Sequence, residues 1–456
     1  MIKRKGLATI AIVLSFAAAP ALKADTLAEA LTAAYNNSGL LEQNRALLRA
    51  ADEGVAQSVA ATLPVISWSI TAERTRTETE LTSIATTDSV LALISANLTL
   101  YDFGVNRLGI DAQKEVVLGT RQTLRGIEQD VLLRGVQAYM SVRSTGEFVQ
   151  LRQNNVRVIT QEFRAAQDRF EVGEVTRTDV ALAEARLAAA RSELASAQGD
   201  LAQAIEEYQA AVGRAPGGPR AVSPAPVSRT IDDAKAFAVR NHPDILEAQH
   251  TVSAAELNIL GAEAAKRPTV GLESFVSVDE ESNRTAQVGV SISGPIYLGG
   301  SLLSQIREAQ ANRDASRASL LQTTIAIEQE VGNAFASLQV AQASRQASEQ
   351  QIRAAQVAFD GVREEATLGS RTTLEVLNAE QELLDAQTNR IAAQASEVIA
   401  SYALLSAMGL LTADHLNLPV QQYDPSEYYN LVKDSPSALS SQGAALDRVL
   451  EAIGKD

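Results

Sequence analysis

The chain has 456 residues and a formal net charge of −15, from 40 basic and 55 acidic residues. This length is ample for a sizeable core, and the acidity argues against nucleic acid as a partner, because phosphate binding needs a basic surface. The absence of cysteine excludes disulfides, thiolate metal sites and thiol nucleophiles. The three histidines lack the spacing of a metal site, so we expect neither a metal nor a cofactor.

Residues 1–24 have the features of a secretory signal peptide. Three basic residues precede an apolar stretch, Leu7–Ala19, and Ala21 and Ala24 are suitable cleavage positions. We therefore expect an exported protein. A signal anchor is the alternative, although the apolar stretch is short for a membrane span.

Proline positions divide the rest of the chain into two halves. Proline is absent from two stretches of more than a hundred residues, whereas residues 214–228 contain four. This pattern predicts a linker between a first half, residues 25–213, and a second half, residues 229–411. Residues 412–456 lie outside both halves and are expected to form an irregular C-terminal tail with a short amphipathic piece at Ala444–Ile453.

The two halves match each other in register. An offset of 204 residues places Pro64 on Pro268, and beyond the extended region an offset of 196 places Tyr101 on Tyr297. The second register then holds for more than a hundred residues, through the pairs Gly104/Gly300, Phe163/Phe359, Gly173/Gly369 and Val180/Val376. We interpret the halves as repeats, each with the order helix, two strands, long helix, helix. The first repeat has the longer extended region.

Alternation with a period of two predicts two strands in each half. In the first half Ile66, Trp68 and Ile70 alternate with Ser and Thr, and a second alternating run follows over residues 90–100. The second half has alternating runs on either side of a polar turn at residues 280–284. We expect four strands of about ten to thirteen residues, a length that suits an outer-membrane crossing. Tyr101 and Tyr297 are expected to close strands, either in an interfacial aromatic belt or packed at the strand–helix junction.

Helical patterns occupy most of the remaining residues. Residues 27–62 are predicted to form one helix, and residues 103–172 a second that spans roughly 100 Å at 1.5 Å per residue. Such a rod needs lateral partners along its whole length. The following helix has apolar residues at a seven-residue period, and so does its counterpart, which predicts coiled-coil packing; the two rows are Val180, Leu187, Leu194, Leu201, Tyr208 and Leu377, Leu384, Ile391, Val398, Leu405.

Helices alone are equally compatible with a soluble periplasmic coiled-coil hairpin, but the strands favour an oligomer. Four amphipathic strands cannot close a barrel, whereas three copies supply twelve. The expected fold is therefore α+β, mostly α. Three chains would form a 12-stranded outer-membrane β-barrel, with four strands per chain, that continues into a periplasmic α-helical coiled-coil tunnel.

Four segments carry a resemblance to a known family, and they are Gly294-Pro-Ile-Tyr-Leu-Gly-Gly300, Leu368-Gly-Ser-Arg-Thr-Thr-Leu-Glu-Val-Leu-Asn378, Val172-Gly-Glu-Val-Thr-Arg-Thr-Asp-Val180 and Asn241-His-Pro243. On these segments the chain resembles the TolC family of outer-membrane efflux proteins over residues 25–411. The resemblance implies a homotrimer in the outer-membrane lipid of a Gram-negative cell, extending into the periplasm. It also implies export of small molecules, or type I secretion of proteins, with an inner-membrane transporter and a periplasmic adaptor.

Two glycine turns are the candidate functional positions. Gly173 and Gly369 lie between long helices, where a positive φ permits a tight reversal. Thr176 with Asp179, and Thr372 with Glu375, then have capping-box spacing. Capping is the structural reading of both carboxylates. By the resemblance, these turns are the periplasmic tips of the tunnel, where the adaptor makes contact.

The resemblance also assigns roles at the tunnel entrance. Thr178, Asp179 and Arg371 occupy positions of the family's gating links, and Glu375 occupies the first position of its acidic entrance ring. The chain departs from the family at two positions. Ala366 replaces the gating tyrosine, so a Tyr–Asp link is not available. Asn378 replaces the second acidic residue, so the ring would carry half the charge.

The leading functional hypothesis is a passive exit duct with no catalysis. The alternative is a periplasmic coiled-coil adaptor or scaffold without a barrel, although the sequence has neither the β-rich lipoyl-type module nor the membrane tether expected of an adaptor. An enzyme is not expected, because no Ser/His/Asp set, phosphate-binding glycine loop or metal cluster is recognisable.

Overall fold

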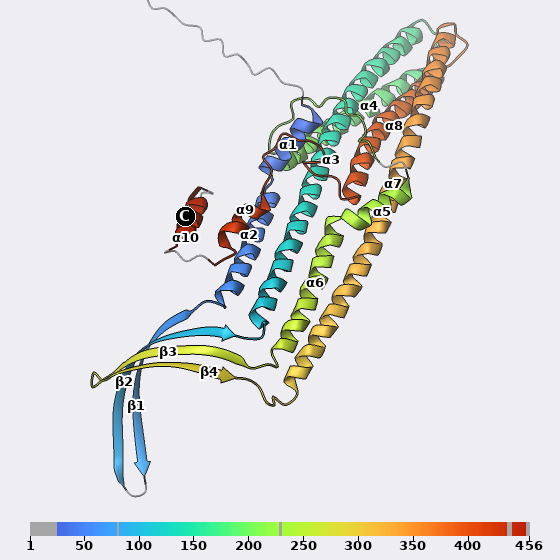
Figure 1. Cartoon of the computed structure of the whole chain (residues 1–456). Helices are drawn as coiled ribbons and strands as arrows, with labels where there is room; N and C mark the ends of the chain where they lie inside the picture. Colours follow the sequence, from blue (N-terminus) through green and yellow to red (C-terminus); the bar gives the residue numbers. More distant parts are fainter. Residues whose placement is uncertain (1–24, 80–81, 228–229, 436–439, 453–456) are drawn as a thin grey trace, which may run out of the picture.

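The computed structural model describes residues 25–79, 82–227, 230–435 and 440–452, so the expected signal peptide lies outside the described residues. The first half contains α1 (Leu27–Asn37), α2 (Gly39–Ala60), β1 (Val65–Thr79), β2 (Thr82–Tyr101), α3 (Val105–Glu171) and α4 (Arg177–Val212). The second repeats this order with α5 (Ile231–Asn241), α6 (Pro243–Ala264), β3 (Thr269–Asp279), β4 (Arg284–Ser293), α7 (Ser301–Thr367) and α8 (Thr373–Ala407). The α+β, mostly helical fold with four strands per chain is confirmed (Figure 1).

The first helical segment is broken, contrary to the prediction of one helix over residues 27–62. Ser38 is extended, at φ −72° and ψ 108°, and its hydroxyl accepts the N–H of Leu41 at 3.2 Å. The second half breaks at the same place, where His242 accepts the N–H of Asp244 before Pro243 starts α6. A polar N-cap within an apolar periodic pattern ends one helix and begins the next.

The four strands form one antiparallel sheet in the order β1-β2-β3-β4. β1 and β2 have 15 and 20 residues, whereas β3 and β4 have 11 and 10. The prediction of ten to thirteen residues was therefore wrong for the first hairpin. Its extra length lies beyond Leu91, where β2 pairs with β1 alone. Polar residues occupy both faces over residues 73–76 and 86–89, so the period-two signal is lost.

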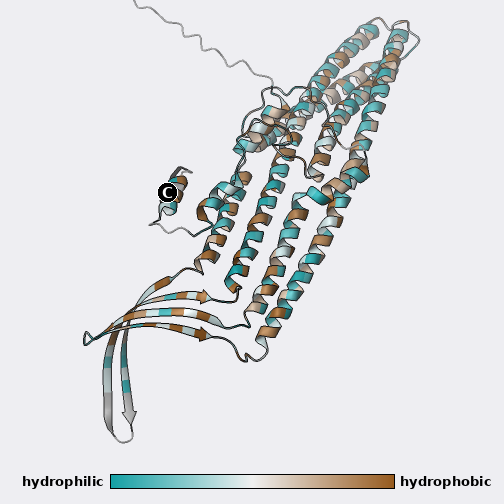
Figure 2. Ribbon diagram, viewed as in Figure 1, coloured by the Kyte–Doolittle hydropathy of each residue, from teal (hydrophilic) through white to brown (hydrophobic). Residues whose placement is uncertain are grey.

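One face of the sheet is apolar across all four strands. Trp68 lies opposite Ile94, which in turn lies opposite Val276, and Figure 2 shows hydrophobic residues recurring along β3 and β4. No other described residue covers this face, and the Trp68 side chain is 77% exposed. The outer edges of β1 and β4 also lack a neighbouring strand among the described residues. An open sheet of this kind requires a partner at its edges and an apolar environment at its face.

The strand ends of the two halves differ. Tyr101 ends β2 and packs its ring edge-to-face against Phe103, with ring centroids 4.7 Å apart. Tyr297 lies beyond the end of β4 and is 82% exposed, so the prediction that it closes a strand was wrong for the single chain. The end of β2 is held by β3, through the pair Tyr101–Val270, whereas β4 is an edge strand with nothing equivalent beside it.

The two longest helices, α3 and α7, run from the sheet to the far end of the molecule (Figure 1). Each has 67 residues, a length of about 100 Å. Near the sheet they pack with α2 and α6, and farther away with α4 and α8. The predicted heptad row of α8 is buried throughout, namely Leu377, Leu384, Ile391, Val398 and Leu405. In α4 only Leu187 and Tyr208 of the predicted row are buried, and a row of small residues at the same period is buried beside them, namely Ala183, Ala190, Ala197 and Ala204. In the described part of the chain, none of the helices has both the length and the apolarity to cross a membrane.

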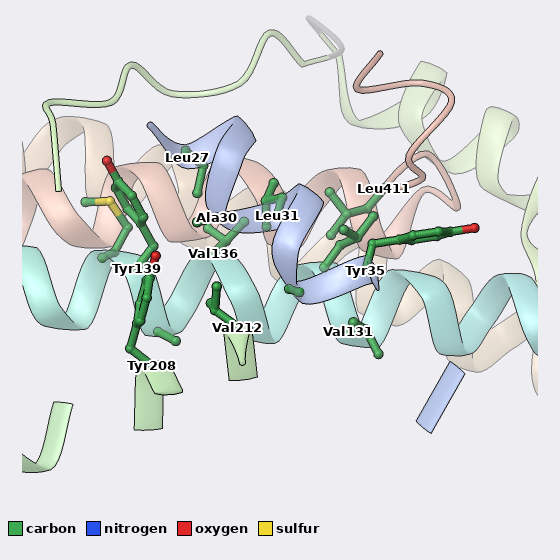
Figure 3. Packing of buried hydrophobic residues seen from close by; sticks show 14 of the residues in the cluster. Leu27, Ala30, Leu31, Tyr35, Val131, Val136, Tyr139, Tyr208, Val212 and Leu411 are labelled. Atoms are coloured by element: carbon green, nitrogen blue, oxygen red, sulfur yellow. The ribbon is translucent and has the colours of Figure 1, made fainter. Parts of the chain in front are cut away.

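The main core lies where α1, α3, α4 and α8 meet the later part of the linker and residues 411–418 (Figure 3). The Tyr139 hydroxyl donates to the carbonyl oxygens of Asp25 and Arg220, at 2.8 and 3.1 Å. The Asp25 carboxylate accepts the N–H of Gly217 at 2.9 Å and pairs with Arg214 at the same distance. The first part of the predicted linker is therefore fixed across the helices.

The C-terminal tail contains one helix that was not expected, in addition to one at the predicted amphipathic piece. It contains α9 (Pro425–Val432) and α10 (Ser441–Ala452), and α9 packs along α2. The Tyr428 hydroxyl donates to Glu53 at 2.6 Å, and Arg121 donates to the carbonyl of Pro425 at 3.2 Å. The tail thus covers one side of α2 and α3.

Replacing Tyr139 with Phe should lower the free energy of unfolding by about 1–2 kcal/mol, because two buried carbonyl oxygens lose a donor while the ring is kept. Urea unfolding of the purified protein in detergent, followed by helical circular dichroism, measures this change. Tyr35→Phe is the matched control, since its hydroxyl points away from the same cluster (Figure 3). Equal effects of the two variants would contradict the assignment.

Candidate functional site at the helix-turn tips

The α3–α4 and α7–α8 turns lie together at the end of the helices farthest from the sheet (Figure 1). Gly173 and Gly369 have φ of +82° and +80°. In the first turn the N–H of Gly173 donates to the carbonyl of Phe170 at 3.0 Å, and that of Glu174 to Arg169 at 2.8 Å. The second turn repeats this pattern. Both are Schellman caps, which favour glycine at the left-handed position.

Each turn is followed by a complete capping box. The Asp179 carboxylate accepts the N–H of Thr176 at 2.9 Å and its hydroxyl at 2.8 Å. Glu375 accepts the same two groups of Thr372, at 2.8 and 3.0 Å. These hydrogen bonds lower the pKa of both carboxyl groups below their usual values. In each case the backbone N–H of the capping threonine has the largest effect. Both groups are therefore charged at neutral pH and fixed in direction.

Arg371 connects the two sides of the second turn. Its guanidinium pairs with Glu365 at 2.7 Å and with Glu375 at 2.9 Å, and these bonds raise its pKa. The first turn has valine at the equivalent position, Val175. The charge of Glu375 is thus partly neutralised within its own turn, whereas that of Asp179 is not.

The other predicted positions have different surroundings. Thr178 is exposed on the first turn of α4. Ala366 is buried against Phe359 and Val376, inside the α7–α8 hairpin. Asn378 accepts a hydrogen bond from Arg186 of α4 at 3.3 Å. No hydrogen bond or ion pair among the described residues joins Thr178 or Asp179 to Arg371 or Glu375, so one chain does not form the predicted link.

One polar contact near the tips was not predicted. The Asn155 side chain of α3 donates to the Glu380 carboxylate of α8 at 2.7 Å, in the buried interface between the two hairpins. Burial raises the pKa of Glu380 to about 7. The equivalent Glu184 in the first repeat is exposed, so the helical pattern contains no signal that separates the two.

Within the described ranges, no group of three or more His, Asp or Glu side chains is arranged to hold a metal ion. The tips present fixed carboxylates and hydroxyls on two rigid helix reversals. This arrangement can repel or attract charged solutes and can bind another helix.

Replacing Thr372 with Val should speed up amide hydrogen exchange in the first turn of α8. The substitution removes the N-cap acceptor, which lowers the local stability of this turn by about 1 kcal/mol. Peptide-resolved exchange followed by mass spectrometry measures this effect.

The neighbouring residue provides the control for that variant. Thr373 is buried and its hydroxyl has no hydrogen-bond partner in the described structure, so Thr373→Val should leave exchange unchanged or slow it. Faster exchange in Thr373→Val than in Thr372→Val would contradict the capping assignment.

Comparison with known proteins agrees with this architecture. The family described as "Outer membrane efflux protein" matches residues 30–214 and 237–410. The outer membrane efflux protein BepC of Brucella suis is 37% identical over 421 residues, which cover 90% of this chain and 91% of BepC. The alkaline protease secretion protein AprF of Pseudomonas aeruginosa is 24% identical and covers 75% of this chain and 74% of AprF.

A solved structure supports the fold. The outer membrane protein VceC of Vibrio cholerae superposes with a TM-score of 0.72 at 20% identity, covering 84% of this chain and 96% of that chain. The matched family spans both repeats and both helix-turn tips. The chain therefore belongs to the outer membrane efflux protein family, the TolC family.

Proposed function

We propose that three copies of this chain assemble into a passive exit duct that crosses the outer membrane and extends into the periplasm. An inner-membrane transporter supplies the energy, and a periplasmic adaptor joins it to the duct. The chain itself performs no catalysis. The observation that carries this proposal is the open sheet, with its uncovered apolar face and two unpaired edges.

The sheet is suited to closure between copies. Four strands are too few for a barrel, and three copies give twelve, an even number typical of outer-membrane barrels. The exposed apolar face, which includes Ile66, Trp68 and Val288, then faces lipid. The opposite face, with Ser67, Ser69 and Glu273, lines the lumen.

The repeat gives the register of this closure. Shifting β1 by 204 residues and β2 by 196 converts the observed pair Ser67–Ser95 into Gly271–Ser291, which is also an observed pair of β3 and β4. The two hairpins thus share one register. The β2–β3 pair Asn97–Glu273 can be converted in the same way. Shifting Asn97 forward by 196 residues gives Ser293 of β4, and shifting Glu273 back by 204 gives Ser69 of β1, which belongs to the next copy.

This register also accounts for Tyr297. The pair Tyr101–Val270 becomes Tyr297 opposite Ile66 of the next copy. Pairing of this kind would extend β4 past Ser293 to Tyr297. Pro295, which cannot donate a ladder hydrogen bond, falls next to an irregularity seen in the β2–β3 pair, a position that proline tolerates.

The turns at the far end become the entrance of the duct. Three copies of Asp179 and Glu375 would surround the opening with negative charge, reduced at Glu375 by its pairing with Arg371. Thr178, Asp179 and Arg371 would form the gating links between hairpins or between copies. Gly173 and Gly369 form narrow rigid tips that an adaptor hairpin would contact.

The cargo is a separate matter. BepC is named for efflux and AprF for protease secretion. Both functions need the same duct, and the higher identity to BepC favours efflux of small molecules. Isolation of the transporter that cross-links to the tips would separate the two.

Introducing Ser69→Cys and Ser293→Cys together should produce covalent trimers under mild oxidation, because opposite Cβ atoms of paired strands lie within disulfide reach. The natural chain has no cysteine, so any cross-link comes from these positions. Non-reducing electrophoresis of outer-membrane fractions measures it.

Ser69→Cys with Gln287→Cys is the control, since Gln287 lies six residues along β4, about 20 Å away, and should not cross-link. Efficient cross-linking of the control pair but not of the first pair would reject the register. Recovery of an uncross-linked monomer in the soluble periplasm would reject the duct and favour a scaffold.

Replacing Arg371 with Ser should raise single-channel conductance in planar bilayers, because the proposed gating link of Arg371 between hairpins or between copies is removed and the entrance is held less firmly closed. Arg177→Ser is the matched control at the first turn, where Arg177 forms no ion pair in the described structure. Equal conductance of wild type and Arg371→Ser would show that Arg371 is only a surface residue.

A further inference from the structure

The two helical hairpins of one chain meet along α3 and α8. Near the tips, the contact between them includes a buried polar pair. Glu380 is 6% exposed, and one of its carboxylate oxygens accepts from the Asn155 side chain at 2.7 Å. The other oxygen is buried without a hydrogen-bond partner in the described structure. A buried carboxylate with half of its acceptor capacity unused is costly when it is charged.

The charged groups around Glu380 do not supply a direct counterion. Glu162 of α3 disfavours a charge on Glu380, whereas Arg186 of α4 and Arg363 of α7 favour it from a distance. Arg363 is itself placed against Glu162, at 3.7 Å. Glu380 also lines a cavity of about 180 Å³ between α3, α7 and α8. The remainder of this cavity is apolar or carries amide groups, including Asn154, Gln356 and Phe359.

The burial of Glu380 comes from the interface between hairpins and not from α8 alone. Its counterpart Glu184 on α4 is exposed, and Gln351, the counterpart of Asn155, is exposed as well. Separation of α8 from α3 would therefore return Glu380 to water. The Glu380 carboxyl therefore binds a proton more tightly in the closed interface than when the hairpins are separated.

We propose that the Asn155–Glu380 contact is a proton-dependent lock between the two hairpins, which is closed when Glu380 is neutral and weakened when it is charged. Glu380 acts here as a positioning residue for the entrance. The proposal rests on the proposed function, because it requires a duct that opens at its tips.

The direction of the pH effect follows from the interface. The pKa of Glu380 is raised by burial to about 7 in the closed arrangement, and solvent exposure on separation would return the pKa to its usual value near 4.3. Protons therefore favour the closed arrangement. The stabilisation of the closed arrangement by protons is complete below the pKa that Glu380 has when exposed. It decreases as the pH rises between the exposed and the buried pKa of Glu380, and it is lost above about pH 7. The carboxyl groups of Asp179 and Glu375 have lowered pKa values, so they titrate below this interval.

The test is single-channel recording of the full-length trimer in planar bilayers between pH 5 and pH 8. The wild type should show an open probability that rises by about tenfold or more between pH 5 and pH 7 and then levels off. Glu380→Gln, a neutral substitute of the same shape, should keep one low open probability at every pH in this range. Glu382→Gln, an exposed position on the same helix, should keep the wild-type profile.

A flat wild-type profile over this interval would overturn the lock, and so would a pH response in Glu380→Gln equal to that of the wild type. Either result leaves the proposed function intact, because channels are still recorded. An absence of channels in every variant, together with a monomeric protein, would instead reject the duct and the lock with it.

Discussion

An amphipathic sheet that one chain cannot complete is the constraint on which the rest of this molecule depends. Its apolar face is exposed, and its β1 and β4 edges have no neighbouring strand in the part of the chain that the structure describes. Pairing of these edges between copies, in a lipid environment, satisfies both requirements at once. Because the two hairpins share one register, the same pairing rule that joins β2 to β3 can join β4 to the next copy. Closure then needs no new interaction type.

The helices extend this arrangement away from the membrane. α3 is the next element after β2 and begins after Gly104, and α7 is the next element after β4 and begins after Gly300, both glycines being left-handed. The number of copies that closes the sheet therefore also sets the number of rods. The hairpin turns end the rods with Schellman caps and capping boxes, which are rigid. Movement at the entrance is therefore expected between hairpins, where the Asn155–Glu380 contact lies, and not within a turn.

Much of the fold could be predicted from the sequence, because the information is periodic and repeated. Alternation in β1 and the heptad row of α8 both appear in the structure, and Gly173 and Gly369 are the left-handed residues expected. The break at Ser38 was missed because a single N-cap does not disturb an apolar period. Tyr297 was misplaced because, in the proposed register, its strand neighbour Ile66 belongs to another copy. The burial of Glu380 could not be predicted, since Glu184 has the same place in the repeat and differs only in which helix packs against it.

The most direct measurement of the central claim is the mass of the complex released intact from the outer membrane, determined by native mass spectrometry with stepwise removal of detergent. The account predicts a single species of three chains, each lacking the signal peptide, because twelve strands close the barrel. A monomer that keeps its native helical content, or a closed assembly of two or four chains, would contradict it.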